Sequence, residues 1–368
     1  MSWAKIVTFI AAIALIAGGA LWAYNFFEAP EHIDTITAKW ETAGHADTAS
    51  RSFTNWDEND PPEVPTACAK CHSMYGYLDF LGADGSPAGQ VDAPAHAGSL
   101  VYCRTCHNQP AHEMTQVTFP SEMTITEATW AANCMQCHQG REASESVEVA
   151  LTGLEPDTVH EELGFINVHY TIAAATLLGG DAQVGYQYAG KDYVGRFEHV
   201  EDFETCIDCH DAHSTSINPN ECSPCHLNVV DRADLREIRE SEIDYDGNAN
   251  VDEPIRDEIR VFHEALYAAI QDYAANVIGQ PIVYGMRSPF FFNDVNGNGT
   301  ADPDELTRDN QYASWTPRLL RAAYNYHYVH QDPGAYAHNA DYIFQLLYDS
   351  MEDLGQVVPV DLESFVRP

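Results

Sequence analysis

The chain has 368 residues, 45% of them hydrophobic, which is enough for two domains of ordinary size. It carries 18 Lys+Arg against 56 Asp+Glu, a formal net charge of −38, so its surface would repel a phosphate backbone. This composition excludes nucleic-acid binding. It favours solubility in salt or a cationic partner.

An uncharged apolar stretch follows Lys5 and runs from Ile6 to Phe27. As a helix, its 22 residues would extend about 33 Å, enough to cross a hydrocarbon core of about 30 Å. Lys5 before it and acidic residues after it predict a cytoplasmic N-terminus and an extracytoplasmic body. We expect residues 1–28 to be a transmembrane anchor. The alternative is a signal peptide cleaved near Gly18, which would release a secreted protein.

All ten cysteines fall in five Cys-x-x-Cys-His motifs. Two thiols at this spacing can add to the two vinyl groups of one haem, and the next residue, histidine, binds the iron. Zinc sites take ligands in fours, which five cysteine pairs cannot supply evenly, and local disulfides would leave the histidines unexplained. We therefore predict five covalently bound haem c groups. The attachment residues are Cys68, Cys71 and His72; Cys103, Cys106 and His107; Cys134, Cys137 and His138; Cys206, Cys209 and His210; and Cys222, Cys225 and His226.

The motifs divide the chain into regions. Residues 29–65 are polar and proline-bearing, and we expect a linker and lead-in. Residues 66–227 hold every motif and are predicted to form a pentahaem domain. They are too few to wrap each porphyrin separately, so the haems should share a haem-filled core and form a conducting chain.

The fold class predicted is mainly α with much irregular structure. The cysteine-free residues 228–368 should form a helical domain, with apolar periodicity predicting helices over 232–243, 255–278, 317–330 and 335–354. Between the third and fourth motifs, we expect a helix over 166–180. A β-hairpin is expected to follow, turning at Gly190.

Two acidic loops in residues 228–368 have the ligand spacing of an EF-hand. The second has Gly299 at the sharp turn and ligands Asp294, Asn296, Asn298, Thr300, Asp302 and Glu305. The first has Asp244, Asp246, Asn248 and Asn250, but Ala249 replaces the glycine and Ile255 replaces the bidentate glutamate. We predict calcium in both loops. The alternative is a pair of Asp/Asn-rich surface turns.

The sixth ligand of each iron decides between an electron carrier and an enzyme. Of 17 histidines, those outside the motifs are more numerous than the five irons, so bis-histidine ligation is easily met. His213, three residues past His210, is the first candidate, followed by His169 and His199. In the tail, one interpretation is that His327, His330 or His338 crosses to a haem. The alternative is that all three are buried or surface histidines of a helical cap stabilised by calcium, and the fifth distal ligand is then His96 or His112.

The chain resembles exported multihaem c-type cytochromes, with a distant similarity to octahaem tetrathionate reductase and hydroxylamine oxidoreductase. The resemblance rests on WETAGHAD, CMQCHQGRE, FINVHYTIAAATLLGG, CIDCHDAH and the tail segment AYNYHYVHQDPGAYAHN. It implies that the distal iron ligands are His45, His169, His199, His213 and either His338 or His330. The octahaem enzymes have an altered catalytic haem, and no such motif occurs here.

We predict a membrane-anchored, extracytoplasmic pentahaem cytochrome c. Its haems would carry electrons between a membrane oxidoreductase and an external acceptor, such as another cytochrome. One alternative is a multihaem reductase of a small nitrogen or sulfur oxyanion, which would need one five-coordinate haem. Another is a structural subunit of a homo-oligomer or cytochrome filament.

Overall fold

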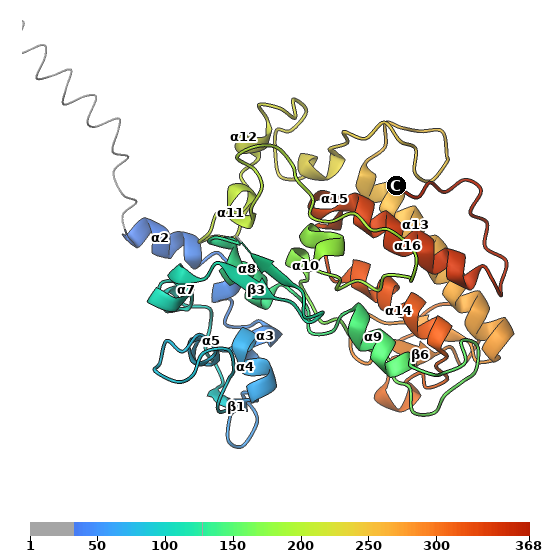
Figure 1. The fold of residues 1–368 in the computed structure, drawn as a ribbon, viewed down its shortest axis with the longest axis horizontal. Coiled ribbons are helices and arrows are strands. Elements are labelled where there is room, and N and C mark those ends of the chain that lie inside the picture. The colour runs from blue at the N-terminus through green and yellow to red at the C-terminus, as the bar shows by residue number, and fades with distance from the viewer. Residues whose placement is uncertain (1–32, 127) are drawn as a thin grey trace, which may run out of the picture.

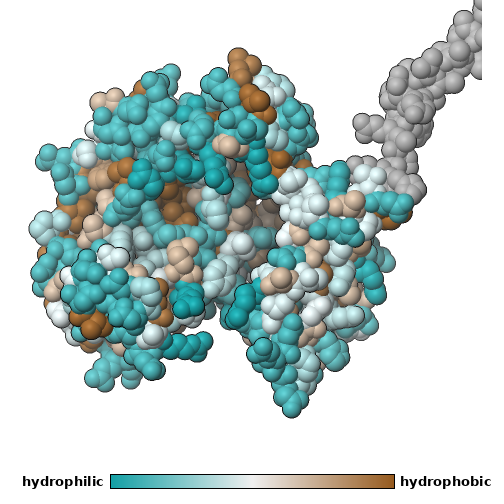
Figure 2. All heavy atoms as spheres, turned by 180° about the vertical axis from the view of Figure 1, so that it is seen from behind, coloured by the Kyte–Doolittle hydropathy of each residue, from teal (hydrophilic) through white to brown (hydrophobic). Residues whose placement is uncertain are grey.

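The computed structural model describes residues 33–126 and 128–368, and it is mainly helical with much irregular structure. The ribbon forms two lobes, with α11 and α12 beside their junction (Figure 1). Seen from behind, a cleft separates the lobes and the surface is mostly hydrophilic (Figure 2). The predicted transmembrane segment, residues 1–28, lies outside the described residues. Within these, no helix combines the length and apolarity needed to cross a membrane.

The smaller lobe is built from short elements between residues 33 and 137. Its two antiparallel pairs join β1 to β2 and β3 to β4. The bounds are α2 Ile33–Trp40, α3 Arg51–Thr54, β1 Glu63–Val64, α4 Thr66–His72, α5 Met74–Phe80, β2 Ala95–His96, α6 Cys103–Cys106, α7 Gln109–Glu113, β3 Gln116–Thr118, β4 Thr124–Thr126 and α8 Ala131–Cys137. A 3-10 turn, Gly44–Ala46, follows α2.

The larger lobe is organised around three long helices that pack on one another, α13, α14 and α16. The helix α14 begins at Pro317, and the side chain of Thr316 caps it by accepting the N–H of Leu319 at 3.2 Å. The remaining bounds are α9 Ser144–Leu151, α10 Ala173–Leu178, α11 Cys206–Cys209, α12 Pro219–Cys222, α13 Ile255–Tyr273, β5 Ile282–Tyr284, β6 Phe291–Asn293, α14 Pro317–His330, α15 Ala335–His338 and α16 Ala340–Leu354. A continuous apolar core joins these helices to residues of the 117–186 segment.

Three of the four predicted tail helices are present. The 255–278 helix is α13 followed by a π-helical turn to Ile278, and 317–330 is α14. Residues 335–354 are divided at Asn339 into α15 and α16. The predicted helix over 232–243 is wrong, because that segment has only the 3-10 turn Asp234–Glu237. Arg239 there donates to the carbonyl oxygens of Ser241 and Glu253, which favours an irregular path.

The prediction of a β-hairpin around Gly190 is also wrong. Its backbone groups pair with helix side chains instead of with each other: the N–H of Tyr186 donates to Asn325 of α14 at 2.8 Å, and that of Val194 to Gln345 of α16 at 2.9 Å. Of the predicted 166–180 helix, α10 forms, followed by a 3-10 turn, Gly179–Asp181. Tertiary hydrogen bonds therefore replaced the local strand pairing.

Candidate haem-binding site

Each Cys-x-x-Cys-His motif folds as one helical turn. The first lies within α4, and in the other four the histidine N–H donates to the carbonyl of the first cysteine: His107 to Cys103 at 2.8 Å, His138 to Cys134 at 3.0 Å, His210 to Cys206 at 2.9 Å and His226 to Cys222 at 3.0 Å. Residues i, i+3 and i+4 of a turn share a face. Both thiols and the imidazole of a motif are therefore presented together.

Backbone carbonyls orient three of these imidazoles. The Nδ1 atoms of His72, His138 and His210 lie 2.7, 2.9 and 3.1 Å from the carbonyl oxygens of Ser52, Thr171 and Thr215. A carbonyl oxygen can only accept, so Nδ1 carries the proton in each ring. The Nε2 lone pair is then left to bind a metal, which is the usual arrangement of a ligating histidine.

Each motif histidine faces one histidine from elsewhere in the chain. The ring centres are 5.8 Å apart for His72–His169, 6.2 Å for His107–His213, 6.3 Å for His138–His45, 6.5 Å for His210–His338 and 6.0 Å for His226–His199. An imidazole nitrogen binds a transition metal at about 2 Å, so two imidazoles on opposite sides of one ion have ring centres roughly 6 Å apart. All five separations fit a bis-histidine iron.

The partners come from distant elements. His45 lies in the 3-10 turn after α2, His213 follows α11, and His338 ends α15 in the larger lobe. His169 has a positive φ of +87°, and its N–H donates to Oδ1 of Asn167 at 2.8 Å. Sequence reasoning missed Asn167, although an asparagine two residues before a ligand is a recognisable signal for a local turn.

The other tail histidines pack within the core. The His330 ring stacks on Tyr284 with centres 4.8 Å apart, and His263 lies edge-on at 4.5 Å. His327 is fully buried, and its Nε2 lies 2.8 Å from Oδ1 of Asn167. Of the tail histidines proposed from the sequence, the structure therefore brings only His338 to a motif.

The pKa of His338 shifts in the opposite direction to those of His45, His72, His138 and His169. Burial lowers the pKa of His45, His72 and His138, and burial together with His72 lowers the pKa of His169 to about 4. Burial also acts to lower the pKa of His338, but contact with Asp332 outweighs it and raises that pKa. Neutral imidazoles are the form that binds metal.

The third motif lies between two others. Its helix α8 contacts both α4 and α11, which carry the first and fourth motifs. The Cys71 side chain lies close to that of Cys137, and the Cys134 side chain lies close to that of Cys206. Attachment points of neighbouring motifs therefore lie side by side, although the motifs are far apart in sequence.

The loop 294–305 gathers oxygen atoms around a tight turn. Asp294 and Glu305 are only 6% and 4% exposed. Asp294 accepts the N–H groups of Gly297 at 2.7 Å and Gly299 at 2.8 Å, and Glu305 accepts that of Val295 at 2.8 Å. The residues at both ends of the predicted ligand pattern thus fold toward the same turn.

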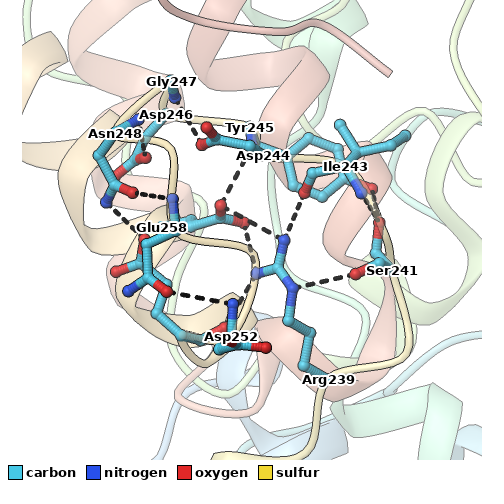
Figure 3. A network of polar contacts seen from close by, with 12 residues as sticks. Arg239, Ser241, Ile243, Asp244, Tyr245, Asp246, Gly247, Asn248, Asp252 and Glu258 are labelled. Carbon is cyan, nitrogen blue, oxygen red and sulfur yellow. Dashed lines mark hydrogen bonds and ion pairs between the residues drawn. The ribbon is translucent and has the colours of Figure 1, made fainter.

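The loop 244–255 acquires a carboxylate that the ligand spacing did not predict. Oxygen atoms of Asp244, Asp246 and Glu258 lie within 4.8 Å of one another (Figure 3). Glu258 is fully buried one turn into α13, whereas Ile255, at the expected ligand position, packs in the core. Arg239 donates to Glu258 at 3.0 Å and shares this carboxylate.

The five motifs and the five ring pairs are typical of multihaem c-type cytochromes, and proteins of this class are what the chain is similar to. The chain is 26% identical over 399 residues to the C-type polyheme cytochrome OmcB of Geobacter sulfurreducens, covering 91% of this chain and 50% of OmcB, in both strain DL-1 / KN400 and strain ATCC 51573 / DSM 12127 / PCA. It is 26% identical to OmcC of the latter strain, over 93% of this chain and 48% of OmcC.

The chain thus spans about half the length of the curated relatives it matches. The printed names of these relatives support covalently bound haem c in this chain. No family profile and no solved structure matches the chain. The resemblance to octahaem tetrathionate reductase and hydroxylamine oxidoreductase is carried by the sequence motifs alone.

Proposed function

We propose that the chain is an extracytoplasmic pentahaem cytochrome c that conducts electrons through five bis-histidine haems. The observation that carries this proposal is the set of five ring pairs, each joining a motif histidine to one other histidine at 5.8–6.5 Å. The distal ligands are then His45, His169, His199, His213 and His338. Each haem would supply one reversible electron, and the protein holds its iron from both sides.

This arrangement favours a carrier over a reductase. A reductase of a nitrogen or sulfur oxyanion needs an open iron site, and every motif histidine here faces a second imidazole. The net charge of −38 also opposes anion capture. Electrons would pass between a membrane oxidoreductase and an external acceptor, such as another cytochrome. Residues 1–28 would tether the protein, or be cleaved to release it.

The positions of the motifs support a spatial order of haems different from the order along the chain. The third motif contacts the first through Cys71 and Cys137, and the fourth through Cys134 and Cys206. We propose that the third haem is the central member of the chain of haems. Close attachment points bring porphyrin edges together, which favours fast electron transfer.

Calcium is a second part of the proposal. The buried Asp294 and Glu305 would contribute ligands at opposite ends of the 294–305 loop. In the 244–255 loop, Asp244 and Asp246 would bind with Glu258, and Arg239 would compete with the ion for that carboxylate. Calcium would stabilise the fold, because its ligands come from loops that flank the long helices.

The haem assignment is tested by counting haems and their spin states. A pyridine haemochrome assay should return five haems c per chain, all low-spin in the oxidised spectrum. His338→Ala should make one haem high-spin and able to bind carbon monoxide once reduced. The matched variant His330→Ala should leave all five low-spin. Three or fewer haems, or a high-spin haem in the wild-type protein, would overturn the proposal.

A further inference from the structure

A buried carboxylate contacts one of the ten paired histidines. Asp332 is 3% exposed, and its two oxygens lie 3.0 and 2.8 Å from Nδ1 of His338. Its Oδ1 also accepts the N–H of Gly334 at 3.0 Å, which fixes the carboxylate within the same turn. In the described part of the chain, its only ion-pair partner is His338. Arg256 and Arg260 line the same pocket as Asp332, but their ion pairs are with Asp257 and Glu264.

The backbone holds the His338 ring in this contact. A Cβ at position 334 would lie 2.7 Å from Cε1 of His338, so the ring packs directly on Gly334. The opposite side of the pair is His210, with ring centres 6.5 Å apart. The ring therefore has a fixed direction, with Nδ1 toward Asp332 and Nε2 left for the iron.

This environment differs from that of the other motif and distal histidines. His72, His138 and His210 donate to backbone carbonyls, which carry no net charge. His226 does have a carboxylate partner, Glu240, at 3.0 Å, but the Glu240 side chain is 77% exposed. Water and salt screen an exposed charge far more than a buried one.

We propose that Asp332 is a positioning residue that lowers the reduction potential of the haem held by His210 and His338. The proposal rests on the bis-histidine function proposed above. A carboxylate that accepts the Nδ1 proton places negative charge on the imidazole and makes it a stronger ligand. Stronger donation stabilises the ferric iron, which carries one more positive charge than the ferrous iron.

The haem held by His210 and His338 is attached between the third and fifth motifs, so its reduction potential affects electron transfer between their haems. The helix of the fourth motif, α11, contacts that of the third, α8, and Cys209 lies close to Cys222 of the fifth. Asp332 also acts electrostatically on His138 of the third motif, so that haem should shift in the same direction by a smaller amount. Transfer of an electron from either neighbouring haem to this low-potential haem is then energetically unfavourable.

The test compares two charge-removing variants by potentiometric titration of the purified holo-protein. Asp332→Asn keeps an acceptor oxygen but removes the charge, and should favour reduction of one haem at least tenfold, which is about 59 mV for one electron. Asp332→Glu should restore most of the wild-type value. Glu240→Gln, at the exposed partner of His226, should change no haem more than about twofold, because solvent already screens that charge.

Two outcomes separate this inference from the function on which it rests. If His338→Ala leaves all five haems low-spin, the bis-histidine assignment fails. If His338→Ala changes one haem but Asp332→Asn moves no potential more than twofold, or moves all five equally, the role of Asp332 is overturned and the proposed function stands. If Asp332→Asn does not mature, Asp332→Ser serves in its place, because it keeps an uncharged side-chain oxygen for the N–H of Gly334.

Discussion

The two lobes are stabilised in different ways. Around residues 53–113, buried apolar side chains form two small groups, one of Val64, Ala69 and Ala95 and one of Tyr77, Leu81 and Ala111. The larger lobe has a continuous core in which Trp315, Phe291 and many other aromatic side chains are almost fully buried. Buried side chains thus account for the packing of the larger lobe, but for little of the packing of residues 53–113.

The difference shows that the apolar surface that stabilises the fold comes from the cofactor in one region and from side chains in the other. A few small side chains cannot offset the conformational entropy of some eighty ordered residues, which is about 1–2 kcal/mol for each backbone unit. Residues 33–113 nevertheless contain two of the five attachment motifs. We infer that porphyrins provide the missing apolar surface there, whereas the larger lobe folds on its own side chains.

The largest expected effect is that of withholding haem. The full chain produced without haem attachment should lose protection throughout residues 33–113 and keep it in α13, α14 and α16. Hydrogen exchange read by mass spectrometry, with the holo-protein as reference, measures both regions in one sample. Equal protection in the two regions would show that the smaller lobe does not depend on haem.

The second-largest expected effect comes from creating a cavity in the core of the larger lobe. Trp315 is fully buried, so Trp315→Ala should lower the free energy of unfolding by about 3–5 kcal/mol. The matched variant is Trp130→Ala, since that side chain is 48% exposed, and its cost should stay near 0.5 kcal/mol. Denaturant unfolding followed by circular dichroism gives both values. Similar costs for the two variants would contradict the comparison.

Calcium should have a smaller effect on the larger lobe. At about one hundred times its dissociation constant, a ligand that binds only the native state adds about 2.7 kcal/mol. Calcium should raise the Tm of the wild-type protein, and Glu305→Gln should abolish most of that rise. Asp304→Asn alters an exposed loop position that is not in the ligand pattern and should keep it. A Tm that calcium leaves unchanged would remove this loop from the proposal.

The smallest effect is a pH dependence at the Arg318 ion pair. Arg318 contacts Asp157 at 2.7 Å and also pairs with Asp353 of α16, and its hydrogen bond lowers the pKa of Asp157. Because the folded-state pKa is depressed, this stabilisation is present at neutral pH and is lost as pH falls below about 4. The Asp157 side chain is 34% exposed, so the loss should stay under about 1 kcal/mol.

Comparing Tm at pH 7 and at about pH 2, well below the ordinary carboxyl pKa, isolates this contribution. Asp157→Asn should be slightly less stable than the wild-type protein at pH 7, and the two should converge on acidification. A difference that persists at about pH 2 would mean that the ionised carboxylate is not what stabilises the fold.

Some of this arrangement is local and could be predicted from sequence. The thiols and imidazole of each motif come from five consecutive residues on one turn, so their spacing alone predicts haem attachment. The helices α13 and α14 are equally local, because their apolar residues repeat at helical spacing and a proline precedes or begins each one. Such features need no knowledge of the rest of the chain.

Only the tertiary structure decided which distant groups meet. The resemblance left either His338 or His330 as the fifth distal ligand. In the structure, α14 turns His330 against Tyr284, while the turn through Asp332 and Gly334 aims His338 at His210. The carboxylate of Glu258, one turn into α13, lies beside Asp244 and Asp246 of the 244–255 loop. The expected hairpin is absent, and Asn325 and Gln345 accept hydrogen bonds from its backbone. These contacts depend on how helices pack, which local spacing does not encode.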